Sequence, residues 1–184
     1  MAQAPKRVAE LLGFRLMKYS KKIHLDPEKT TPVGLVRYAE DFLLSSITVE
    51  RELGPKIGAG QIPAVPSLYL IGHSIELAFK AFLLAHGVTL DRLISDFRHD
   101  LQKCFNEAKS LGIENEFCPS EPERGAFELL DVLYSSKQLE YVVTGMKYMP
   151  LFPLVQAFAI KLLKVVSSHV GFECRHTVER DGQI

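Results

Sequence analysis

"YLIGHSIELAFKAFLLAHG", residues 69–87, is the most apolar stretch of the chain, yet it carries one acidic and one basic residue, Glu76 and Lys80. Gly87 provides a natural C-terminal stop. We therefore expect a helix over about residues 65–87. Because this helix is apolar most of the way round, it belongs at the centre of a helical bundle rather than on its surface.

The two charges belong to a polar stripe on that helix. Spacings of four, three and four residues place Tyr69, His73, Glu76 and Lys80 on one face. An exposed Glu–Lys pair at this spacing contributes only about 0.3–0.5 kcal/mol, so stability alone does not explain a charged pair in so apolar a segment. The stripe therefore either lines a surface groove or meets partner groups on another helix or subunit.

The same segment, extended back to Pro66, is nearly long enough to cross a membrane. Charges near the centre of such a span cost about 2.5–3.5 kcal/mol each on insertion scales, so a buried helix and no membrane association are expected. The basic N-terminus lacks the apolar run of a signal peptide. Three cysteines without CxxC spacing fit reduced thiols and a cytoplasmic protein.

Composition indicates one globular domain over residues 1–184. The chain holds 22 basic and 22 acidic residues, so no global field draws it to nucleic acid. Residues 1–29 are basic, with seven Lys or Arg against three acidic residues, and residues 89–132 are acidic, with ten against five. These regions could associate with each other, or could simply be solvated surfaces. A flexible tail is expected over about residues 173–184.

Cap residues and apolar periodicity predict an all-α bundle of four to five substantial helices and no confident strand. Thr31 with Pro32, Asp100, and Ser120 with Glu123 are helix-start signals. The expected helices cover about residues 32–53, 65–87, 100–112, 120–135 and 153–171. No metal or other cofactor is expected, since Cys174 and the histidines near it are too few for a tetrahedral zinc site.

A second polar cluster is Arg98-His99-Asp100. Asp100 is the expected cap of the following helix. His99 then lies beside a helix N-terminus, where the dipole favours anions and an imidazole could act as a general acid or base. A small anion could bind at this helix N-terminus.

These two clusters together resemble the core signature of HEPN domains. In that family a helix carries Glu and, four residues on, Lys, and a His-Asp-Leu opens the next helix, as Glu76, Lys80 and the His99–Leu101 tripeptide do here. "MKYMP", at 146–150, is similar to an Arg-Tyr-Pro motif of the family, with Lys147 in place of arginine and Met149 inserted before Pro150. The resemblance covers roughly residues 32–170.

The resemblance implies a compact HEPN-like bundle, often dimeric, that binds nucleotides, cuts RNA, or partners a nucleotidyltransferase or an antitoxin. In the nucleolytic members four to six residues separate an Arg from a His, and these residues of two subunits meet at the dimer interface and cleave RNA without metal. Here six residues separate Arg92 from His99.

Three functions stay open. The first is a homodimeric module that binds a nucleotide, an RNA or a partner protein; its expected binding residues are His73, Glu76, Lys80, Arg98, Asp100, Lys147 and Tyr148. The second is a metal-independent endoribonuclease of the toxin or phage-defence kind, with Arg92 and His99 catalytic. The third is a purely structural or dimerisation bundle.

Overall fold

The computed structural model describes residues 26, 29–57, 62–141 and 148–174, and within these residues the chain is helical with no strand. The expected all-α fold is confirmed. The helices, in chain order, are α2 (Pro32–Ile57), α3 (Val65–Ala85), α4 (Leu90–Arg92), the π-helix η2 (Leu93–Phe97), α5 (Leu101–Ser110), the 3₁₀-helix η3 (Ile113–Asn115), α6 (Glu121–Ser135) and α7 (Phe152–Val170).

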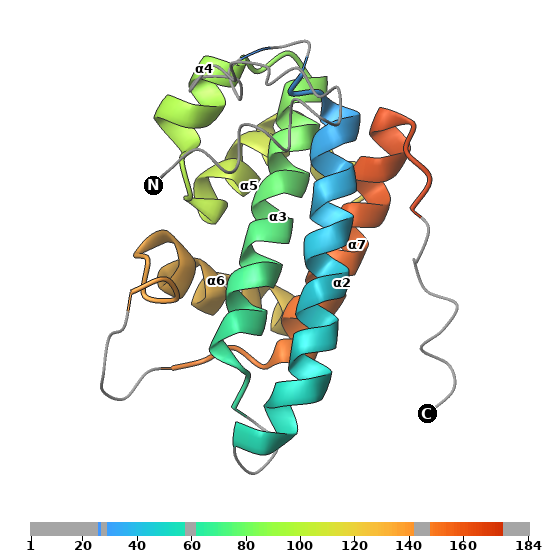
Figure 1. The fold of residues 1–184 in the computed structure, drawn as a ribbon. Coiled ribbons are helices and arrows are strands. Elements are labelled where there is room, and N and C mark those ends of the chain that lie inside the picture. Colours follow the sequence, from blue (N-terminus) through green and yellow to red (C-terminus); the bar gives the residue numbers. More distant parts are fainter. Residues whose placement is uncertain (1–25, 27–28, 58–61, 142–147, 175–184) are drawn as a thin grey trace, which may run out of the picture.

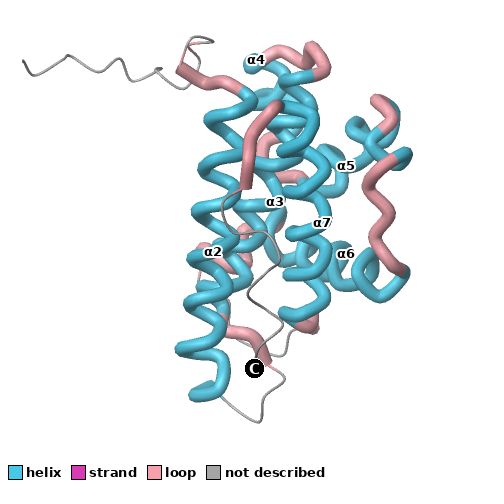
Figure 2. The backbone as a smooth tube through the Cα atoms, turned by 90° about the vertical axis from the view of Figure 1, so that its right-hand side faces the viewer, coloured by secondary structure: helices cyan, strands magenta, loops and turns pink. Residues whose placement is uncertain are grey.

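Helix α3 occupies the centre of the bundle. It packs against α2, α5, α6 and α7, and α2 and α7 also contact each other (Figures 1 and 2). Among the described residues, α3 is the one helix with the length and hydropathy of a membrane span, and 61% of its most apolar window is buried within the bundle. The apolar side chains of α3 therefore form the centre of the hydrophobic core.

Four helices meet through one phenylalanine each. Phe79 of α3, Phe105 of α5, Phe127 of α6 and Phe158 of α7 are buried. The rings of Phe127 and Phe158 stack with centroids 4.5 Å apart, and Phe79 packs edge-on against both of them. Buried aromatic side chains remove large apolar areas from water and prefer such offset or edge-on geometry. This cluster fixes α5 and α6 against the central helix.

Most predicted helix ends are confirmed. Thr31 accepts from the Gly34 amide at 3.1 Å, and Ser120 forms the predicted capping box at the start of α6. The glycines that end α3, α5 and α7 all have positive φ, as left-handed C-terminal caps require: Gly87, Gly112 and Gly171.

One predicted boundary is wrong, and one helical segment was missed. Helix α2 continues past the predicted stop at Leu53 to Ile57. Gly54 leaves space there for the Glu50 side chain, and the Glu50 carboxylate in turn accepts from the backbone N–H of Ala64 at the start of α3. The helical turns of α4 and η2, which follow α3, were not predicted. Lys147 and nearly all of the expected basic and C-terminal segments, residues 1–25 and 175–184, lie outside the described residues.

Candidate functional site

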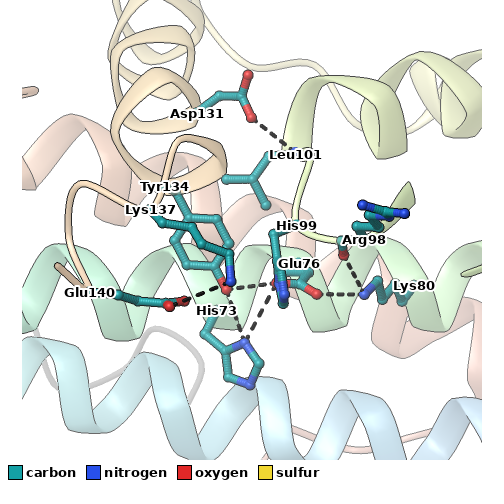
Figure 3. Close-up of polar contacts among 10 residues, drawn as sticks. All are labelled: His73, Glu76, Lys80, Arg98, His99, Leu101, Asp131, Tyr134, Lys137 and Glu140. Carbon is teal, nitrogen blue, oxygen red and sulfur yellow. Dashed lines mark hydrogen bonds and ion pairs between the residues drawn. The ribbon is translucent and has the colours of Figure 1, made fainter. Parts of the chain in front are cut away.

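A buried carboxylate, that of Glu76 on α3, is the centre of the candidate site. Its Oε1 accepts from Lys80 Nζ one turn along the helix. Its Oε2 accepts from the Tyr134 hydroxyl of α6 at 2.6 Å and from His99 Nδ1 at 3.1 Å, and lies 3.7 Å from His73 Nδ1 (Figure 3). We call these five residues the Glu76 cluster. The polar stripe therefore faces α6 and the turn before α5.

The surroundings of Glu76 favour its ionised form. Burial raises the pKa of the carboxyl, since the side chain is 3% exposed, but the His73 imidazole 3.7 Å away, the charge of Lys80 and the Tyr134 hydroxyl together outweigh burial. The pKa of Glu76 is consequently held well below its usual range. Burial, and then the Glu76 charge, raise the pKa of Tyr134. The cluster therefore pairs a carboxylate with an un-ionised phenol.

These protonation states determine the tautomers of both imidazoles. Tyr134 donates its single proton to Glu76, so its oxygen accepts from His73 Nδ1 at 3.0 Å. The carboxylate only accepts, so His99 Nδ1 also carries a proton. In a neutral imidazole the other nitrogen, Nε2, is then the basic one. The His73 side chain is 29% exposed and that of His99 is 45% exposed, so both rings reach solvent.

A strained turn presents His99 to Glu76. Arg98 has a φ of 46° and a ψ of −111°, and it directly follows the π-helix η2. A side chain in this left-handed region costs about 1–3 kcal/mol and persists only where its surroundings hold it. Lys80 Nζ donates to the Arg98 carbonyl at 2.7 Å. The Arg98 side chain itself is exposed, and its Nε donates to the Ser95 carbonyl.

Two carboxylates cap α5. Asp100 accepts from the Lys103 amide at 2.7 Å, as predicted for an N-cap. Asp131 of α6 accepts from the amides of Leu101 and Gln102 at 2.9 and 3.3 Å. The first-turn N–H groups that could have bound a small anion therefore already have negatively charged partners. Any anionic ligand of this region must instead use the side chains of the preceding turn.

We expect Asp131→Ala to lower the free energy of unfolding by about 1 kcal/mol, the usual cost of losing a helix N-terminal acceptor, with Asp131→Asn much closer to wild type. Asparagine keeps the accepting oxygen but removes the charge. The charged form of Asp131 is disfavoured at this position, because burial and the nearby Asp100 charge raise its pKa, so losing the charge should cost little. Urea denaturation of both variants tests this. Equal losses in the two variants would show that the charge, rather than the acceptor, stabilises α5.

Among the described residues, Arg92 and Tyr148 make no hydrogen bond or ion pair with the Glu76 cluster. Arg92 contacts Asp96 at 3.2 Å and Glu107 at 3.3 Å, and its guanidinium packs over the Phe97 ring. Tyr148 is 84% exposed. The structure thus brings together His73, Glu76, Lys80, the Arg98 turn and His99, but it gives Arg92 different partners. In the described part of the chain no group of three His, Cys, Asp or Glu side chains could hold a metal ion.

Sequence reasoning missed Tyr134, Asp131 and Gly72. Tyr134 lies among the buried residues of α6, and a buried phenol needs a hydrogen-bond partner; this is the signal that could have linked it to Glu76. A Cβ at Gly72 would lie 2.5 Å from the Tyr134 ring, so the glycine makes room for that ring. A glycine inside an apolar helix is itself a signal of close packing. No sequence pattern points to Asp131.

No family model, curated protein or solved structure matches this chain.

Proposed function

We propose that this protein is a HEPN-like helical module that self-associates and binds a nucleotide or RNA. The observation that carries the proposal is the orientation of His99: a buried carboxylate holds one ring nitrogen at 3.1 Å, and the rest of the half-exposed ring is free to meet a ligand. Arg98 lies next to it on a strained turn held by Lys80. Strained backbone is often retained where it positions functional groups.

The proposed contacts are to phosphate. The Arg98 guanidinium uses Nε internally, which leaves its two terminal amino groups for an anionic oxygen. Guanidinium and imidazole groups form charge-assisted hydrogen bonds to phosphate. The chain has equal numbers of acidic and basic residues, and tight binding of long nucleic acid normally needs many phosphate contacts from a basic surface. A mononucleotide or a short single-stranded RNA is therefore the preferred ligand.

The test is a calorimetric titration with a panel of nucleotides and a short 2′-O-methyl RNA. We expect Arg98→Gly to weaken binding by about tenfold or more, since a hydrogen bond to a charged group contributes about 1.5–3 kcal/mol. Glycine is the right replacement because it accepts the positive φ of this position. Arg51→Ala, on the exposed face of α2, is the matched control and should bind like wild type.

Binding that is absent for every ligand, or equal in wild type and Arg98→Gly, would contradict the proposed phosphate site. Because Arg98→Gly also relieves backbone strain, its melting temperature should not fall. A loss of affinity in this variant therefore cannot be attributed to unfolding.

A second candidate is a metal-independent endoribonuclease of the toxin or defence kind. The carboxylate-bound imidazole of His99 suits a general acid or base, whereas Arg92 is engaged by Asp96 and Glu107. A third candidate is a structural bundle. It is favoured by Glu76 and Lys80, whose contacts join α3 to α6 and to the turn before α5. A partner nucleotidyltransferase or antitoxin is implied by the family resemblance alone.

A further inference from the structure

We propose that the C-terminal segment of this chain, residues 175–184, docks against the bundle through an ion pair between Arg175 and the buried carboxylate of Glu40 on α2. The segment directly follows the last described residue, Cys174. The inference does not depend on the nucleotide or RNA ligand proposed above, because none of its residues belongs to the Glu76 cluster.

Glu40 is a buried acidic residue that lacks a partner. It is 5% exposed, and its Oε1 is the one buried side-chain nitrogen or oxygen in the described residues that has no hydrogen bond. The nearest cation along α2, Arg37, is exposed and does not supply this bond. A buried charge without a partner is costly, and buried carboxylates are almost always paired. The fold therefore leaves a place for a cationic donor at Glu40.

The described end of the chain lies near this carboxylate. After α7, Gly171 has a left-handed φ of 68°, and the Phe172 N–H donates back to the Ser167 carbonyl at 2.9 Å. The Cys174 Sγ lies 2.8 Å from the Ser167 hydroxyl, so the chain runs back beside α7 (Figures 1 and 2). Burial, and then the Glu40 charge, raise the pKa of the Cys174 thiol. Cys174 is thus within electrostatic range of Glu40.

Arg175 is the next residue along the chain. Consecutive Cα atoms are about 3.8 Å apart, so its long side chain begins one residue from a position already near Glu40. A guanidinium presents its N–H donors in a planar fork that matches both oxygens of a carboxylate, and arginine suits buried ion pairs. The other arginine of the segment, Arg180, is five residues farther on and stands between Glu179 and Asp181. Charge and chain length therefore both favour Arg175.

The first test is thermal denaturation of the full chain in a double-mutant cycle of Glu40→Gln and Arg175→Gln. Glutamine keeps the volume of glutamate and removes its charge. We expect each single variant to lower the melting temperature by about 4 °C or more, as breaking a buried ion pair does in a chain of this size. The double variant should melt no lower than the single ones, because it leaves no unpaired charge. Arg180→Gln is the matched control and should melt like wild type.

Trypsin digestion of the same full-length variants reports docking of the segment itself. Trypsin cuts after Arg and Lys, and a docked segment is a poor substrate because cleavage needs exposed backbone. The bond between Arg175 and His176 should therefore be cut slowly in wild type. We expect Glu40→Gln to speed this cut by about tenfold or more, since proteolysis follows the population of the undocked state.

A melting temperature of Glu40→Gln above that of wild type would overturn the proposal, since a buried charge that nothing pairs gives this result. Additive effects of Glu40→Gln and Arg175→Gln would overturn it as well, as would coupling of Glu40→Gln to Arg37→Gln instead. Equal rates of trypsin cleavage in wild type and Glu40→Gln would contradict docking of the segment. None of these measurements involves a nucleotide or RNA, so their failure is distinct from failure of the proposed function.

Discussion

Glu76→Ala is expected to lower the free energy of unfolding by about 3–5 kcal/mol, the cost of removing one partner from a buried ion pair. The variant leaves Lys80, whose side chain is only 14% exposed, without its carboxylate. It also removes the acceptor of the Tyr134 hydroxyl and of His99 Nδ1. Urea denaturation followed by circular dichroism measures the loss.

Two controls separate charge from packing. Adding Lys80→Met to Glu76→Ala should recover part of the loss, because removing both charges leaves no unpaired ion in the core. Glu76→Gln keeps the volume and one acceptor and should lose less than Glu76→Ala. A Glu76→Ala variant within about 1 kcal/mol of wild type would instead match an exposed ion pair, and would contradict the central role given to this carboxylate.

The Glu76→Gln comparison also has a defined pH dependence. The folded-state pKa of Glu76 lies below its unfolded value, so the stability contributed by the charge is complete above the unfolded pKa of about 4.3. It is lost as the pH falls from there towards the lower folded-state pKa. The stability gap between wild type and Glu76→Gln should therefore shrink as the pH falls below the unfolded pKa of the carboxyl. A stability gap that widens on acidification would contradict a folded-state pKa of Glu76 below the unfolded value.

The fold was predictable because its signals are local. Helical periodicity, caps such as Thr31 and Ser120, and the glycine stops act within a few residues of one another. The alignment of His73, Glu76 and Lys80 on one face also follows from helix geometry alone. These signals are enough to define five long helices and to place the polar stripe on the central one.

The partners of the stripe were not predictable in the same way. Tyr134 is 58 residues from Glu76 in sequence, and Asp131 is 30 residues from the amide it accepts from. Such contacts depend on how α6 crosses α3 and α5, and no local pattern encodes that crossing. Arg98 is a further case, because a non-glycine residue with positive φ contradicts local preference and is held by Lys80 from another element.

Gly72→Ala is expected to destabilise the protein by about 1–3 kcal/mol, the range for overpacking a well-packed core. In most helices the same change stabilises by about 0.5–1 kcal/mol, because alanine loses less backbone entropy on folding. Here the added Cβ would lie 2.5 Å and 2.9 Å from two carbons of the Tyr134 ring. The ring is buried, so it must shift, and its hydroxyl then leaves Glu76 Oε2.

Gly125→Ala on α6 is the matched control, because an added Cβ there meets nothing within 4 Å, and it should stabilise the protein or leave it unchanged. Tyr134→Ala removes the clashing ring, so Gly72→Ala should cost less, or even stabilise, in that background. Thermal and urea denaturation of the four variants in this cycle give the coupling directly. Equal effects of Gly72→Ala in both backgrounds would mean that the glycine does not act through Tyr134. A strong coupling would instead show that the missing side chain at Gly72 makes room for the Tyr134 ring, so that its hydroxyl can donate to the Glu76 carboxylate.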